Sequence, residues 1–277
     1  MEIKTDGVKP YHITEGRAED FGKATQDFNK FHEKYAYGSQ VTGWTRNQTN
    51  ELLKSGGLEL KCAKQESRFS AIPIPIGSQI RLPRVVRIEY DDREKQARVA
   101  FNLYFKDDAE EKDPIVEAVL VYRANLQTGR AELAGSPLST FELRQKPAEL
   151  VAAALEREGI DLQTLAFGYA SPALQEQTTR IINPGELPIF LSQKIEFYDT
   201  TQPLKVGDNI YIAITNAKRR KGIGGGERET IDTSVIDLTT AKDEPNGEII
   251  TKTRFIIGII GQGQAVELAE GIKKVSK

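Results

Sequence analysis

The fold class is decided by the stretch from Arg98 to Lys106, which reads RVAFNLYFK. Apolar Val, Phe, Leu and Phe occupy every second position between its two charged ends, and smaller or polar residues stand among them. Strict alternation places successive side chains on opposite faces of a strand, which is typical of a sheet with one buried face. We therefore expect a β-rich chain whose sheet packs one face on the core.

Strand-like runs continue on both sides of this stretch, separated by Gly, Pro and short charged turns. Such spacing is typical of consecutive antiparallel strands, and two prolines near residue 75 favour an edge position for the first run. The expected strands are 69–76, 79–90, 98–106, 114–123, 130–143, 178–182, 187–198, 208–218, 230–238 and 248–261.

Helical spacing of apolar residues occurs in four places. Aromatic residues three and four apart predict a helix over 15–36, with charged residues such as Asp27 on its other faces. A second helix is expected at 147–159, because Pro147 suits the first helical position and Gly159 a helix end. Shorter helices are expected at 45–55 and at 264–275.

About ten strands against four helices predict a mainly β protein, α+β by content. We expect two halves that each resemble a β-sandwich or jelly roll. Segments 87–92 (RIEYDD) and 194–199 (KIEFYD) share one pattern, which a duplication or chance explains. The expected division is an N-terminal arm with helices at 1–57, a first sandwich at 58–145, a hinge helix at 146–160, and a second sandwich with a C-terminal helix at 161–277.

Composition excludes several classes of protein. The 277 residues carry 38 basic and 40 acidic side chains, so no global charge favours nucleic acid or an anionic membrane. One Cys excludes an internal disulfide, and two His exclude most histidine-rich metal sites. No apolar run approaches the roughly 20 residues of a membrane span. We expect no cofactor and no metal, and the N-terminus predicts cytoplasmic synthesis.

Candidate catalytic residues are few. No Gly-x-Ser-x-Gly motif occurs, and His12 and His32 are interpreted as surface or packing histidines. Cys62 is expected to be a small buried hydrophobe. The acidic run 107–113 is interpreted as a charged turn, and the ligase-like KTDG at 4–7 as a chance match. These observations predict a chain that is not an enzyme.

The most unusual segment carries consecutive cations followed by glycines, KRRKGIGGGER at 218–228. It leads into a β-branched run rather than a helix, so it lacks the geometry of a phosphate-binding loop. We interpret it as a hairpin tip that is either solvated or contacts nucleic-acid phosphates or an acidic patch on a neighbouring copy. The residues assigned to this anionic partner are Lys218, Arg219, Arg220, Lys221 and Arg228.

These observations favour a structural protein that assembles with copies of itself, such as a viral or phage coat subunit in a virion. The residues expected at subunit contacts of this homo-oligomer are Phe21, Phe28, Phe31, Leu268 and Ile272. The first alternative is a protein that binds single-stranded nucleic acid through the basic loop and sheet tyrosines. The second is a hydrolase that uses two carboxylates brought together by the fold.

Overall fold

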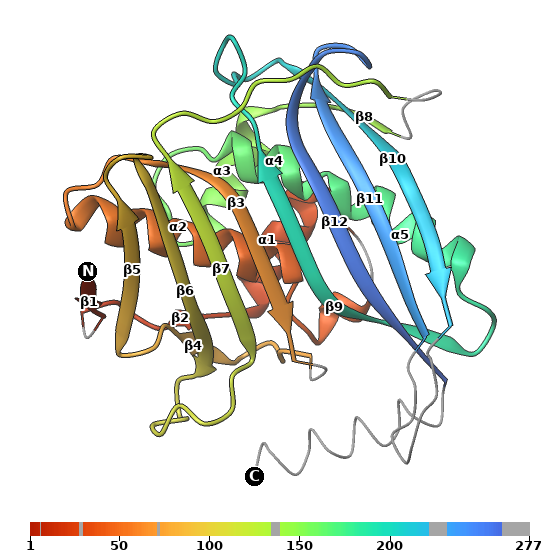
Figure 1. The fold of residues 1–277 in the computed structure, drawn as a ribbon. Helices are drawn as coiled ribbons and strands as arrows, with labels where there is room; N and C mark the ends of the chain where they lie inside the picture. Colours follow the sequence, from red (N-terminus) through yellow and green to blue (C-terminus); the bar gives the residue numbers. More distant parts are fainter. Residues whose placement is uncertain (6, 28–29, 71–72, 134–138, 222–231, 262–277) are drawn as a thin grey trace.

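The structure is a computed structural model that describes residues 1–5, 7–27, 30–70, 73–133, 139–221 and 232–261. One long twisted sheet forms the molecule's front, and the helices lie together on its other face (Figure 1). The helices are α1 (Glu15–Thr25), the 3-10 turn η1 (Lys30–Glu33), α2 (Gly38–Ser55), α3 (Gln145–Ala154), α4 (Leu162–Gly168) and α5 (Ala170–Ile181). The strands are β1 (Glu2–Lys4), β2 (Tyr11–His12), β3 (Lys61–Phe69), β4 (Gln79–Arg81), β5 (Val85–Asp91), β6 (Gln96–Phe105), β7 (Val116–Arg123), β8 (Ser139–Glu142), β9 (Glu186–Phe197), β10 (Asn209–Arg220), β11 (Asp232–Lys242) and β12 (Glu248–Gly261).

The sheet has the strand order β1-β5-β6-β7-β3-β9-β12-β11-β10-β8, with β4 beside β6 and β2 beside β4. The prediction of two sandwiches is therefore wrong, because β3 and β9 pair antiparallel and join both halves into one sheet. Each half buries its inner face against helices rather than against a second sheet. Alternation of apolar and polar residues along a strand predicts that one face is buried, but a layer of helices and a second sheet produce the same pattern.

The two halves mirror each other about the β3–β9 pair, because the order read outward from the centre is the same. β3, β7, β6, β5 and β1 correspond in this order to β9, β12, β11, β10 and β8. The shared pattern at 87–92 and 194–199 lies on β5 and β9, which are not counterparts. That pattern is therefore no trace of the correspondence between the halves.

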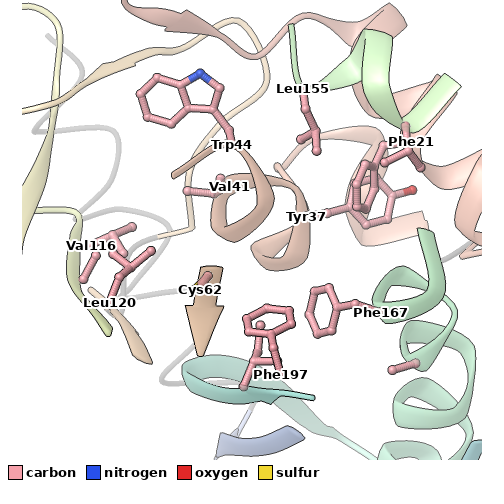
Figure 2. Packing of buried hydrophobic residues seen from close by; sticks show 14 of the residues in the cluster. Phe21, Tyr37, Val41, Trp44, Cys62, Val116, Leu120, Leu155, Phe167 and Phe197 are labelled. Carbon is pink, nitrogen blue, oxygen red and sulfur yellow. The ribbon is translucent and has the colours of Figure 1, made fainter. Parts of the chain in front are cut away.

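Helix α2 is buried on nearly every side and lies at the centre of the core. Val41 and Trp44 face the apolar cluster (Figure 2), and Trp44 stacks on Tyr11 with ring centroids 5.1 Å apart. Its first two turns hold Gly and Thr residues with low helix propensity, which explains why the sequence predicts a start only at 45. The hydroxyls of Thr45 and Thr49 donate to carbonyls four residues earlier.

Other predicted boundaries also change. Helix α1 ends at Thr25 because Gln26 adopts the left-handed conformation, with φ of 58°. The predicted strand 178–182 is instead the end of α5. Of the predicted strand 130–143, residues 139–142 form β8, residues 130–133 belong to no strand, and residues 134–138 lie outside the described part of the chain. Most of α3 lies within the predicted hinge helix 146–160, and α3 packs on α1 and α4. The predicted helix 264–275 lies outside the described residues.

Candidate active site

A carboxylate and an imidazole meet where the chain leaves α1 and enters α2. The backbone N–H of Asp27 donates to the carbonyl of Gly22 at 3.0 Å, which completes the left-handed turn at Gln26. His32 lies in η1, five residues further on. Its Nε2 is 3.9 Å from Oδ2 of Asp27, and both side chains are largely buried. We name Asp27 and His32 the dyad.

The opposite nitrogen of the imidazole fixes the orientation of His32. Nδ1 is 3.2 Å from the carbonyl oxygen of Tyr35, which can only accept a hydrogen bond. In the neutral ring the proton therefore sits on Nδ1, and the lone pair of Nε2 faces Asp27. Tyr35 is held in turn by a bridge to Pro75, so the carbonyl has a fixed position.

Burial sets the protonation state of His32. Desolvation lowers its pKa below the usual 6.5, and the nearby Asp27 carboxylate opposes this shift without cancelling it. The imidazole is thus neutral at pH 7 and can accept a proton. Together the two side chains form a pair that can remove one proton and deliver another, as general acid–base catalysis requires.

The ring of Tyr37 covers the imidazole. Its hydroxyl donates to the backbone carbonyl of Asp27 at 3.0 Å, so Tyr37 contacts both members of the dyad. The ring also packs on Phe21, with centroids 5.4 Å apart (Figure 2). Gly22 makes this packing possible, because any Cβ there would collide with the Tyr37 hydroxyl.

The N-terminus of α2 begins at the residue after Tyr37. Tyr37 is the N-cap residue and makes no side-chain hydrogen bond to the first turn. The first N–H groups of a helix have no partner within the helix, and they carry its positive end. Gly38 lies close to the ring of Phe190, which a Cβ would meet at 3.0 Å. The dyad and a positive helix end therefore occupy the same corner of the core.

Sequence reasoning missed the dyad for a specific reason. A continuous helix over 15–36 would turn Asp27 and His32 about 140° apart, since each residue advances the helix by about 100°. The break at Gln26 removes that constraint. The useful signal was that this chain has only two histidines and that one of them follows an aspartate closely.

Of the five predicted contact residues, the structure fully describes only Phe21. Phe21 is 0% exposed and belongs to the core, so its assignment to a subunit contact is wrong. Phe28, Leu268 and Ile272 lie outside the described residues, and only the backbone of Phe31 is described. The homo-oligomer predicted from these residues therefore stays a prediction.

The predicted basic cluster lies at the end of β10, where Lys218, Arg220 and Lys221 are exposed. Arg219 instead forms ion pairs with Glu186 and Asp232, each with a closest distance of 2.8 Å. Its hydrogen bonds lower the pKa of Glu186 to about 2. Arg219 thus ties β10 to β9 and β11. Arg228 lies outside the described residues.

The outer face of the sheet carries a charged groove of about 490 Å³ over β9, β11 and β12. Four of the charged residues that line it form two ion pairs. Arg254 binds Asp237 at 2.7 Å, and Lys194 binds Glu196 at 2.6 Å. The dyad is not among the residues that line this groove.

The described residues lack two further features. No group of three or more His, Cys, Asp or Glu side chains there is placed to hold a metal ion. No helix in the same part of the chain is long and apolar enough to cross a membrane.

Known structures share this architecture. A protein assigned as a MaoC domain dehydratase from Chloroflexus aurantiacus aligns over 95% of both chains, with a TM-score of 0.62 and 10% identity. HtdX of Mycobacterium tuberculosis aligns over 94% of this chain and 100% of its own, with a TM-score of 0.56 and 9% identity. No family model matches the chain, and no curated protein sequence matches it.

A conserved hypothetical protein of Mycobacterium tuberculosis, described as a double hotdog fold, covers 94% of this chain and 96% of its own, with a TM-score of 0.56 and 9% identity. The predictions of a jelly-roll coat subunit in a virion and of a chain without catalysis are wrong, because the similar structures include dehydratases, which are enzymes. The nucleic-acid-binding and carboxylate-hydrolase alternatives gain no support from these structures. The chain has the double hotdog fold.

Proposed function

We propose that this protein is a dehydratase that interconverts a β-hydroxyacyl thioester and its α,β-unsaturated counterpart by loss or addition of water. The observation that carries the proposal is the buried dyad of Asp27 and His32 at the N-terminus of α2. Similar structures that are dehydratases support the same reaction class.

Elimination of water from such a substrate needs a base and an acid. The base removes the proton from the α carbon, the C–O bond at the β carbon breaks, and the acid protonates the departing hydroxyl. Nε2 of neutral His32 can take the α proton, and the imidazolium so formed beside the Asp27 carboxylate can pass that proton to the departing hydroxyl, which leaves as water. Hydration reverses these transfers, so the pair returns to its starting state over a cycle.

The reaction also needs a group that stabilises the negative charge of the transition state, and the N-terminus of α2 can provide it. Removal of the α proton places negative charge on the carbonyl oxygen of the thioester, and N–H groups aimed at that oxygen stabilise the transition state. The N–H groups of Gly38 and Ser39 are suited to this role because Tyr37 provides no side-chain cap. A thioester suits the site, since its α protons are more acidic than those of an ester.

The test is turnover of a trans-2-enoyl thioester series of increasing chain length by the purified full chain. Loss of the enoyl absorbance and a mass gain of one water would support the proposal. Asp27→Asn and His32→Gln should lower turnover at least about 100-fold, whereas His12→Gln, which changes the other, exposed histidine, should retain it. Absence of turnover across the series, or turnover that survives His32→Gln, would overturn the proposal.

A further inference from the structure

A set of polar side chains lies on the inner face of the sheet, beneath α2. It comprises Gln65 and Ser67 on β3, Gln193 on β9, and Thr251 and Thr253 on β12. Every member is at most 3% exposed. We name these residues the inner polar set. Apolar residues usually fill this position between a sheet and its covering helix.

Strand register brings these residues together. Ser67 pairs with Gln193, and Gln193 with Phe255, in one row across the three central strands. In the adjacent row Gln65 and Thr253 both pair with Ile195. The inner polar set thus spans the junction between the two halves rather than being scattered through the core.

Each member also has a buried polar atom without a hydrogen-bond partner in the described part of the chain. The atoms are Gln65 Oε1, Ser67 Oγ, Gln193 Nε2, Thr251 Oγ1 and Thr253 Oγ1. Buried polar groups are nearly always hydrogen-bonded, so five together require an explanation. The set contains a fixed acceptor, a fixed donor and three hydroxyls that can do either.

The inner polar set is connected to the dyad through α2. The Thr42 hydroxyl donates to Gln193 Oε1 at 3.0 Å, and Gln65 Nε2 donates to the Thr42 carbonyl at 2.9 Å. Thr42 follows Gly38 by four residues, so it lies on the same helix face about 5 to 6 Å further along the axis. The ring of Phe190 lies beside Gly38, and Phe190 is on β9, the strand that also carries Gln193.

We infer that the inner polar set is the specificity site for the acyl group, and that it selects an acyl chain bearing a hydroxyl group beyond the reacting carbons. Such a hydroxyl can donate to Gln65 Oε1 and accept from Gln193 Nε2. A saturated chain would leave these atoms unpaired, and sites built to hydrogen-bond a group strongly reject analogues that lack it. This inference rests on the proposed function and names its substrate class.

The test measures binding rather than turnover. Two pairs of pantetheine thioesters are titrated into the full chain by calorimetry. The first pair is 5-hydroxyhexanoyl- and hexanoyl-pantetheine, and the second is 7-hydroxyoctanoyl- and octanoyl-pantetheine. At least one hydroxylated thioester should bind about 10-fold more tightly than its saturated partner, which is the effect of one good hydrogen bond in a buried site. Equal affinities within both pairs, or no binding of any thioester, would overturn the inference.

Substitutions in the inner polar set test which residues cause the preference for the hydroxylated thioester. Gln193→Leu and Thr253→Val should each reduce the preference for the hydroxylated thioester to less than about 3-fold, because each removes a polar group from the site. Thr253→Ser keeps the hydroxyl and should keep the preference, which separates hydrogen bonding from packing. A preference that survives both Gln193→Leu and Thr253→Val in folded protein would overturn the assignment to these residues.

The two proposals fail in distinguishable ways. Selective binding without turnover of any enoyl thioester would leave the specificity site standing and remove the dehydratase. Turnover of saturated and hydroxylated chains with equal kcat/KM, together with equal affinities, would leave the dehydratase standing and remove the specificity site.

Discussion

The imidazole of His32 lies face to face with the phenol ring of Tyr37, with ring centroids 3.6 Å apart and planes inclined by 22°. Because Tyr37 is also the N-cap residue of α2, this stacking couples the dyad to the helix end. The stacked ring keeps water from one face of the imidazole, which contributes to the desolvation that lowers the pKa of His32. The packing of Tyr37 therefore sets both the position and the basicity of His32.

The first prediction concerns the dyad itself. His32→Gln and Asp27→Asn should each lower kcat about 10²- to 10⁴-fold, because each removes one partner of the acid–base pair. Circular dichroism and thermal unfolding should show that both variants remain folded. Since His12 is exposed on β2, His12→Gln is the matched control, and its kcat should equal that of the unchanged protein.

The second prediction concerns pH. Burial lowers the pKa of His32, so the acid limb of the kcat/KM profile should have its midpoint below pH 6.5. The free energy of unfolding should also fall as the pH is lowered below about 6.5. The unfolded chain binds the proton first, so the contribution of the neutral imidazole is complete above about pH 6.5 and is lost as pH falls through the folded pKa.

Urea unfolding between pH 8 and pH 5 measures this contribution. The unchanged protein should lose stability over the range just below pH 6.5 more steeply than His32→Gln, which has no group to titrate there. Parallel pH dependence of the two proteins would show that His32 has an ordinary pKa in the folded state.

The third prediction tests the contact between Gly22 and Tyr37. Gly22→Ala should lower the free energy of unfolding by about 1–3 kcal/mol, because the new methyl group collides with the Tyr37 hydroxyl. Tyr37→Phe should also destabilise, because the Asp27 carbonyl loses its donor. The double variant should cost about 1 kcal/mol less than the sum, since removing the hydroxyl relieves the collision. Additive costs would contradict this packing.

The fourth prediction concerns a buried ion pair remote from the dyad. Lys242 Nζ lies 3.1 Å from Asp208 Oδ2, and both side chains are at most 4% exposed. Lys242→Met should cost about 3–5 kcal/mol, because it leaves Asp208 charged and buried without its partner. Asp208→Asn combined with Lys242→Met should recover most of that loss in urea unfolding. A single variant as stable as the double would contradict the assignment.

Some features of this protein follow from local sequence. The alternation in 98–106 is enough to predict β6 with one buried face, because a strand's period of two is fixed by its backbone. The start of α1 is likewise local, since the hydroxyl of Thr14 accepts from the N–H of Arg17.

Only the tertiary structure decided the rest. No property of β3 or β9 alone states that they pair with each other, and that pairing makes one sheet of two halves. Helix α2 forms against its own propensities because burial in the core stabilises it. The dyad follows the left-handed residue Gln26, which ends α1. By itself the sequence determined the periodicity of its elements, whereas their partners, and hence the candidate site, were decided by packing between residues far apart in the chain.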